Sequence, residues 1–220
     1  MLKRIALIFC LIFILTEVKG QDIPKSLDKY LKVIGVKFTP NEQYAVTPFK
    51  REGGEYACKD IDCPLWQLQV INAELVNLDK QCKVYVYISG AYTLPGKIIE
   101  KNPGLFGNTK TDDMSYNRIK SDFRYGRHLS AATKQDIVDI KMMLHYYPQD
   151  SAKELFNAGY MMSYPFNMQG RECHDNFTRS RVIVIGKNGL DIFLYFVMTD
   201  KGIEDFDKYL NDFKGTFWYN

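Results

Sequence analysis

The stretch RVIVIGKNGLDIFLYFVM, residues 181–198, carries the strongest indication of the fold. Two runs rich in β-branched and aromatic residues, Arg181–Gly186 and Leu190–Met198, flank the tripeptide Lys187-Asn188-Gly189. Asn-Gly between two such runs is the strongest short signal for a β-hairpin. In the second run both alternating sets of positions are mostly apolar, so we expect this strand to lie inside a sheet rather than at its edge.

The sequence after the hairpin predicts an amphipathic helix that packs back on the sheet. Thr199 and Asp200 offer an N-cap, and Gly215 is suited to end the helix. Between them, apolar residues recur at three- and four-residue steps: Ile203, Phe206, Leu210 and Phe213. We expect these residues to face the sheet and three carboxylates to face water: Asp205, Asp207 and Asp212.

Two further helices are predicted before the hairpin. The first begins at Thr133 and carries an apolar stripe that ends at Leu144. His145 is then expected in its last turn, where a histidine interacts favourably with the end of a helix. The second helix is expected to begin at Ser151, because Glu154 follows at the spacing of a capping box.

Strands are predicted in the earlier sequence as well. Cys82–Gly90 alternates between apolar and other residues, and Tyr160–Tyr164 is a short β-rich run. Pro64–Leu78 fits either a strand or a helix, and we expect a strand paired with Cys82–Gly90. Leu27–Ile34 fits either a short amphipathic helix or the start of a strand.

These elements together predict the α+β fold class: a mainly antiparallel sheet with helices packed on it, ending in a β-hairpin followed by an amphipathic helix. No internal repeat or linker divides residues 21–220, which we interpret as one domain. Within it, Ala91–Ser130 is long and rich in turn-forming residues. Such long loops are uncommon in compact domains and are often functional.

The first 20 residues have the pattern of a secretory signal peptide. Lys3 and Arg4 precede the apolar run Ile5–Leu15, and small residues stand before Gln21. The apolar run is shorter than the roughly 20 residues that a membrane-spanning helix needs. We therefore expect cleavage near Gly20 and a periplasmic or secreted chain without a transmembrane anchor.

Composition excludes some classes of protein. The chain has 220 residues, 46% of them hydrophobic and 25% charged, which is typical of a globular protein and not of a disordered one. The full sequence has 29 basic and 26 acidic residues. Without the first 20 residues these counts fall to 26 and 25, a net charge of +1. This balance predicts no nucleic-acid partner.

Four cysteines remain after the predicted cleavage: Cys58, Cys63, Cys82 and Cys173. In an oxidising compartment an even number favours disulfides, and we expect at least one. Cys58 and Cys63 can close a short loop, which leaves Cys82 and Cys173 for a long-range bridge. Free buried thiols are one alternative. A zinc site that also uses His174 is another, but the spacing of Cys58 and Cys63 matches no common zinc pattern. We expect no metal.

No motif predicts catalysis or a cofactor. The glycine-rich stretches 90–97 and 104–110 lack the spacing of a phosphate-binding loop. Cys173-His174-Asp175 has catalytic residue types, but neighbours along the chain rarely converge as a nucleophile, a base and an orienting group. For His128 and His145 we expect structural roles.

The only local concentration of basic residues in the sequence lies at the end of the turn-rich segment, and aromatic residues are interspersed among them. We call it the basic-aromatic segment, and its candidate residues for an anion or an acidic partner are Arg118, Lys120, Arg124, Tyr125, Arg127 and His128. Guanidinium groups bind carboxylates and phosphates well. The alternative is an ordinary solvated amphipathic stretch.

Part of the sequence resembles a group of known proteins. Phe156-Asn157-Ala158-Gly159, Tyr164-Pro165 and the run Asp205-Phe206-Asp207-Lys208-Tyr209-Leu210 resemble uncharacterised exported proteins of Bacteroidota, over roughly the C-terminal third. The hairpin–helix ending is also similar to the PsbP-like α+β fold. Neither resemblance implies an activity or a functional residue.

We therefore expect an exported, non-enzymatic binding or interaction protein of the bacterial cell envelope, which meets a protein or envelope component through Ala91–Ser130. Two alternatives stay open. A hydrolase acting on envelope or host material would need converging acid and base groups in a cleft. A structural component of an envelope assembly would show an exposed strand edge or a large apolar patch.

Overall fold

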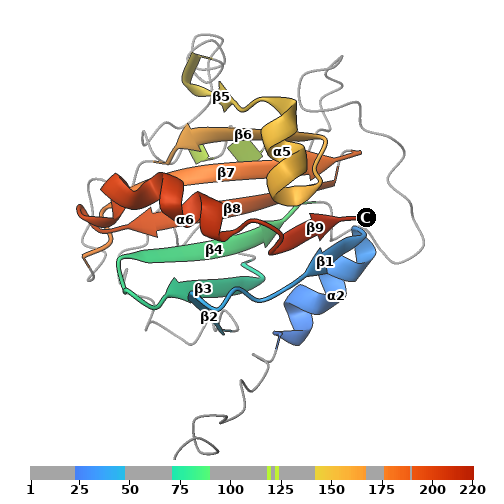
Figure 1. Cartoon of the computed structure of the whole chain (residues 1–220), viewed down its shortest axis with the longest axis horizontal. Helices are drawn as coiled ribbons and strands as arrows, with labels where there is room; N and C mark the ends of the chain where they lie inside the picture. Colours follow the sequence, from blue (N-terminus) through green and yellow to red (C-terminus); the bar gives the residue numbers. More distant parts are fainter. Residues whose placement is uncertain are drawn as a thin grey trace, which may run out of the picture.

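The computed structural model describes residues 23–47, 71–89, 118–119, 122–123, 142–166, 176–188 and 190–220. Most of these residues build a seven-stranded antiparallel sheet of order β2-β3-β4-β8-β7-β6-β5 (Figure 1). Its strands are β2 (Tyr44–Thr47), β3 (Ala73–Asn77), β4 (Cys82–Ile88), β5 (His145–Tyr146), β6 (Tyr160–Pro165), β7 (Arg179–Lys187) and β8 (Leu190–Met198). A second sheet pairs β1 (Val36–Phe38) with β9 (Phe217–Tyr219).

Three helices have defined bounds: α2 (Lys25–Val33), α5 (Gln149–Phe156) and α6 (Phe206–Asp212), the last preceded by a 3-10 turn, Gly202–Asp205. Residues 118–119, 122–123 and 142–143 are helical as well. These elements confirm the expected α+β class, with a mainly antiparallel sheet and a C-terminal hairpin followed by a helix. No helix in the described ranges is long and apolar enough to cross a membrane.

The predicted hairpin is formed by β7 and β8, which pair from Arg179–Met198 to Lys187–Leu190. Asn188 in the turn has φ +57°, a left-handed conformation that asparagine tolerates better than most residues. As expected, β8 is internal, because it pairs with β4 on one side and β7 on the other (Figure 1). Burial on both faces explains why β8 is apolar at both alternating sets of positions.

The predicted amphipathic helix is α6, and its apolar side is buried as expected. Phe206, Leu210 and Phe213 are at most 5% exposed, and the Phe206 and Phe213 rings pack on Phe196 of β8 at 5.4 Å and 5.3 Å between centroids. The hydroxyl of Thr199 accepts a hydrogen bond from the Gly202 N–H at 3.0 Å, which is the predicted cap.

One water-facing position of this helix was predicted wrongly. Asp205 and Asp207 are exposed, but Asp212 is half-buried. Its Oδ2 is buried and has no hydrogen-bond partner among the described residues. Asp212 is the last residue of α6, and its backbone carbonyl accepts a hydrogen bond from the side-chain amide of Asn41. The next residue, Phe213, packs on the ring of Tyr44 at the start of β2. Helical periodicity cannot predict these contacts with a segment far away in sequence.

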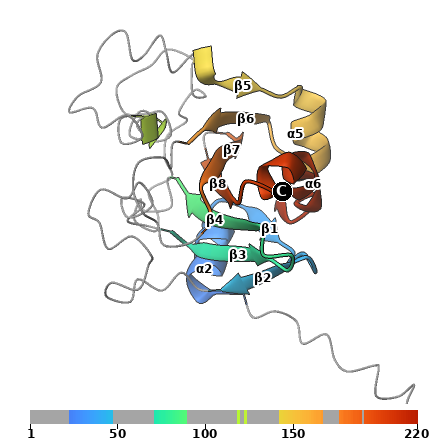
Figure 2. The same cartoon turned by 90° about the vertical axis from the view of Figure 1, so that its left-hand side faces the viewer.

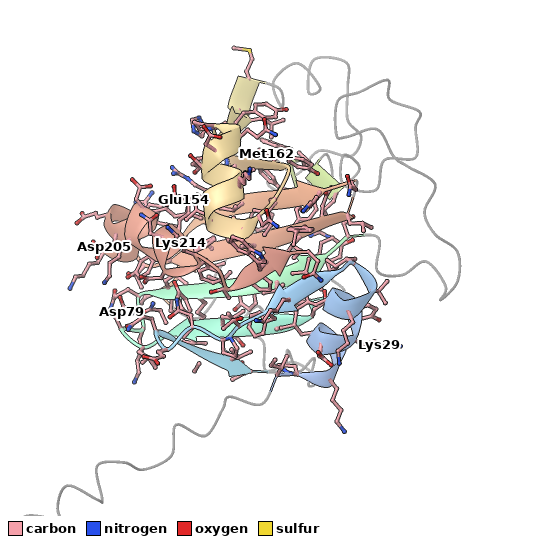
Figure 3. All side chains as sticks on the ribbon, turned by 45° about the vertical axis from the view of Figure 1, so that its right-hand side comes forward. Lys29, Asp79, Glu154, Met162, Asp205 and Lys214 are labelled. Carbon is pink, nitrogen blue, oxygen red and sulfur yellow. The ribbon has the colours of Figure 1, made fainter. Side chains whose placement is uncertain are left out.

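Helix α5 begins two residues earlier than predicted, at Gln149 instead of Ser151. Pro148 precedes its first turn with φ −52° and extended ψ, so the proline ring sets the start in place of a side-chain cap. Asn157 ends the helix with φ +50°. An ion pair of 2.6 Å between Lys214 and Glu154 ties α5 to the chain after α6 (Figure 3).

The two ambiguous segments are resolved where the structure describes them. β3 is a strand and pairs with β4 from Ala73–Val86 to Val76–Lys83, as expected, while residues 64–70 lie outside the described residues. Leu27–Ile34 belongs to helix α2 and its end, and its apolar side is buried through Leu27, Leu31 and Ile34.

The two faces of the seven-stranded sheet differ. One face packs against α2, α5, α6 and the small sheet in a large apolar core, and we call it the helix-covered face. The other carries Tyr85, Tyr87, Tyr164 and Tyr195, and we call it the tyrosine face. Figure 2 shows α5 and α6 on one side of the sheet and the yellow-green helical residues 118–119 and 122–123 on the other.

His145 is not in a helix, contrary to expectation. It lies in β5, exposed, and pairs with Ser163 of β6. Pairing with β6 ends the helical stretch at Met143, which local sequence could not indicate. The predicted signal peptide, the start of the predicted Thr133 helix and most of Ala91–Ser130 lie outside the described residues.

Candidate binding site on the tyrosine face

Four helical residues contact the tyrosine face: Arg118, Ile119, Asp122 and Phe123. We call them the anchoring residues. Ile119 and Phe123 are buried in the apolar cluster of this face, at 0% and 8% exposure. Arg118 Nε and Asp122 Oδ1 form an ion pair of 2.9 Å at the i, i+4 spacing that faces one side of a helix.

The sheet supplies two hydroxyl groups to the same carboxylate. In the strand register, Tyr164 of β6 and Tyr195 of β8 both stand opposite Val182 of β7, so their side chains emerge on one face two strands apart. The Tyr164 hydroxyl donates to Asp122 Oδ2 at 2.6 Å, and the Tyr195 hydroxyl donates to the same atom at 2.8 Å. Arg118 Nε also donates to the Tyr195 hydroxyl at 2.8 Å. We call these four residues the Asp122 cluster.

Aromatic rings surround the Asp122 cluster. The Arg118 guanidinium lies over the rings of Tyr87 and Tyr195, with 5.1 Å and 5.6 Å to the centroids, within the range of cation–π attraction. The Phe123 ring packs on Tyr164 at 5.5 Å. Apolar and aromatic packing thus buries the Asp122 carboxylate and confines the Arg118 guanidinium, which keeps 16% of its side chain exposed.

Burial and hydrogen bonding act in opposite directions on Asp122. Burial raises its pKa, while Arg118 and the hydroxyls of Tyr164 and Tyr195 lower it; the net direction is upward. For Arg118, burial lowers the pKa, but Tyr195 and Asp122 raise it, and the net direction is again upward. Burial and the Asp122 charge raise the pKa of both tyrosines well above the ordinary value, so both stay hydrogen-bond donors.

This arrangement fixes the position of a chain segment. Both oxygens of Asp122 accept hydrogen bonds, and each bond comes from a group that the sheet or the neighbouring helical turn holds in place. Buried charged groups with such partners are costly to separate. The Asp122 cluster therefore attaches the start of the basic-aromatic segment firmly to the sheet.

Of the predicted partner-binding residues, only Arg118 falls within the described ranges. It is largely buried in the Asp122 cluster, with 16% of its side chain exposed. The other five lie outside the described residues: Lys120, Arg124, Tyr125, Arg127 and His128. The structure therefore gives one predicted site residue a defined environment and leaves the rest as predictions.

Cys82 is the one cysteine in the described ranges, and it is a free, fully buried thiol, so the long-range bridge expected between Cys82 and Cys173 was predicted wrongly. Burial raises its pKa far above the ordinary value, more than the hydrogen bond with Tyr44 lowers it. Cys58, Cys63 and Cys173 lie outside the described residues, as does His174. No group of side chains that could hold a metal ion occurs in the described ranges.

Sequence reasoning missed the partners of Arg118. The i, i+4 spacing of Arg118 and Asp122 was available as a signal, but it predicts only a local ion pair. Tyr164 and Tyr195 are 42 and 73 residues from Asp122 in sequence. Only the register of three strands brings them to one carboxylate.

Comparison with known proteins gives a likeness in fold and nothing more. No protein-family model matches the sequence, and no curated protein compared with it matches either. Among solved structures, the chain is weakly similar to the solution structure of cyanobacterial PsbP (CyanoP) from Synechocystis sp. PCC 6803. The TM-score is 0.41 at 11% identity, over 86% of this chain and 88% of that one. The resemblance to exported Bacteroidota proteins stays a prediction.

Proposed function

We propose that this chain is an exported, non-enzymatic binding protein of the cell envelope, and that its basic-aromatic segment contacts an acidic protein or envelope component. The observation that supports this most directly is the Asp122 cluster, which fastens the beginning of the segment to a rigid sheet. Binding groups are commonly carried by connecting segments that a rigid scaffold positions.

The order of residues in the segment supports the same proposal. On a helical projection with about 100° per residue, the four anchoring positions fall on one side. The basic positions fall on the opposite side: Lys120, Arg124, Arg127 and His128. A helix that continued with this pattern would present its basic side away from the sheet, where charge-assisted hydrogen bonds to a partner can form.

The chemistry of the Asp122 cluster favours binding over hydrolysis. A general base needs a carboxylate that can take up a proton from a substrate. Asp122 instead accepts hydrogen bonds at both oxygens from three neighbouring groups. The tyrosine hydroxyls are held protonated, as described above. These groups position the chain, and the hydrolase alternative gains no support from them.

A different observation favours the structural alternative as second candidate. Tyr146, in β5 at the edge of the described sheet, is 51% exposed, and Met142, three residues before β5, is 80% exposed. Exposed apolar side chains next to a sheet edge are typical of assembly contacts. Concentration-dependent association of the purified chain that Met142→Lys abolishes would favour this candidate.

The experiment that tests the binding proposal starts from the full-length chain, tagged and expressed in its native host. A partner is captured from the cell-envelope fraction and identified, and its affinity for purified variants is measured. Arg124→Ala with Arg127→Ala should weaken binding by at least about tenfold, because two charge-assisted contacts are lost. The unfolding midpoint should stay unchanged.

The matched control removes two basic side chains elsewhere. Lys153 on α5 and Lys201 before the 3-10 turn are both exposed, so the Lys153→Ala, Lys201→Ala double variant changes the net charge equally. It should bind like the parent chain. Equal affinity for all three proteins would refute the proposed site, and early unfolding of the arginine variant would assign these residues a structural role. The export part of the proposal has its own test: cleavage of the signal peptide would leave a purified chain whose first residue is Gln21.

A further inference from the structure

Arg118 uses only one side of its guanidinium group within the protein. A guanidinium carries five N–H donors, one on Nε and four on the two Nη atoms. Nε is engaged by Asp122 Oδ1 and the Tyr195 hydroxyl. Among the described residues, Nη1 and Nη2 have no hydrogen-bond partner, and they are not sealed from solvent. The outer edge of the group is therefore open.

The open edge is held in a fixed orientation. Asp122 and Tyr195 bind the inner side, and the rings of Tyr87 and Tyr195 confine the plane of the guanidinium. The Tyr87 ring is itself held edge-on against Phe193, with 5.6 Å between centroids. A mobile surface arginine loses side-chain conformational entropy when it binds a ligand. Arg118 has already lost this entropy on folding, so ligand binding costs less conformational entropy.

The charge of Asp122 does not block an anion from this edge. Asp122 is fully buried on the Nε side, and both its oxygens are occupied by donors of the Asp122 cluster. In the planar guanidinium, one N–H group of each Nη atom points outward, away from Cδ and the Nε–H side. Two parallel N–H groups of a guanidinium match the two oxygens of a carboxylate or a phosphate group.

We propose that the outer edge of Arg118, over the Tyr87 ring, is an oxyanion-binding site that takes a carboxylate or phosphate group of the ligand. The inference rests on the proposed function in assigning this group to the ligand of the basic-aromatic segment. It adds the chemical class of the group that is recognised and the atoms that recognise it.

The test uses the unaltered full-length chain, labelled with ¹⁵N, and follows the Nε–H signals of its arginines by NMR. The probes are sodium phosphate and sodium acetate, each added at constant pH and compared with sodium chloride at equal ionic strength. We expect a saturable shift of the Arg118 signal with half-saturation in the millimolar range. A shift with both probes assigns a general oxyanion site, and a shift with one assigns phosphate or carboxylate.

Arg179 is the internal control. Its Nε also pairs with an aspartate, Asp200, at 2.7 Å, but 48% of its side chain is exposed. We expect its signal to drift with ionic strength without saturation. A variant adds a second readout: Tyr87→Leu removes the ring under the guanidinium but keeps every hydrogen-bonding group of the Asp122 cluster, and should weaken anion binding by about threefold.

The proposal is overturned if the Arg118 signal does not saturate with either probe, or if Arg179 saturates at the same concentration. It is also overturned if Tyr87→Leu leaves half-saturation unchanged. These results are separable from those for the proposed function. The anion probes do not depend on Arg124 or Arg127, so the double variant can lose its partner while the Arg118 shift persists, and the reverse can also occur.

Discussion

Replacing Asp122 with alanine is expected to destabilise the protein more than replacing either tyrosine that binds it. The substitution removes the acceptor of three donors at once: Arg118 Nε, the Tyr164 hydroxyl and the Tyr195 hydroxyl. It also leaves a largely buried guanidinium without its counter-ion. Breaking one partner out of a buried ion pair costs about 3–5 kcal/mol, and we expect a value in this range.

The tyrosine variants divide this effect into parts. Tyr164→Phe removes one hydrogen bond to a charged acceptor but leaves Asp122 paired with Arg118 and Tyr195, so the expected cost is about 1.5–3 kcal/mol. Tyr195→Phe removes the bond to Asp122 and also an acceptor for Arg118, so it should cost more than Tyr164→Phe. The expected order of destabilisation is Tyr164→Phe, then Tyr195→Phe, then Asp122→Ala.

Urea unfolding followed by tryptophan fluorescence measures these changes, with the midpoint and the slope fitted separately. Tyr147→Phe is the matched control. Tyr147 is half-buried, and its hydroxyl has no hydrogen-bond partner among the described residues, so the change should stay within about 0.5 kcal/mol. If Tyr164→Phe costs no more than Tyr147→Phe, or Asp122→Ala no more than Tyr164→Phe, the Asp122 cluster does not anchor the segment as described.

Two further predictions rest on the burial of Phe206 and Asp212, and a third concerns the cysteines. Phe206 is 4% exposed and packs on Phe196, so Phe206→Ala should cost about 3–5 kcal/mol in urea unfolding, against less than about 0.5 for exposed Asp205→Ala. Burial raises the pKa of Asp212, so its charge opposes folding; Asp212→Asn should raise the unfolding midpoint at neutral pH, and this gain should vanish below about pH 4. We expect one disulfide among Cys58, Cys63 and Cys173, so alkylation in denaturant without reductant should modify two thiols, Cys82 and one other; four modified thiols would contradict this expectation.

The regular elements near the C-terminus could be predicted because their signals are local. In β7 and β8, alternation and the Asn188 turn act between neighbouring residues, and in α6 the apolar repeat of three and four residues sets the buried side. These patterns record which side of each element loses contact with water. These patterns therefore predict the buried side of each element without knowledge of the rest of the fold.

The start of α5 depends on another local signal, because the ring of Pro148, directly before Gln149, sets it in place of a cap at Ser151. The environments of Asp212 and His145 depend on tertiary contacts instead. The Asp212 carbonyl accepts a hydrogen bond from Asn41, and His145 pairs with Ser163 of β6. In these two cases a contact with another segment outweighed a local preference.

For the candidate site, the sequence determined the residue types and the i, i+4 spacing of Arg118 and Asp122, and tertiary structure decided their role. A cluster of basic and aromatic residues is compatible with a solvated stretch or a binding surface. Arg118 became a fixed, largely buried group because the register of β6, β7 and β8 places Tyr164 and Tyr195 on either side of Val182, under Asp122. Strand register depends on pairing between segments that are distant in sequence. The burial of a charge depends on all the residues that cover it. The spacing of neighbouring residues in the sequence therefore predicts neither.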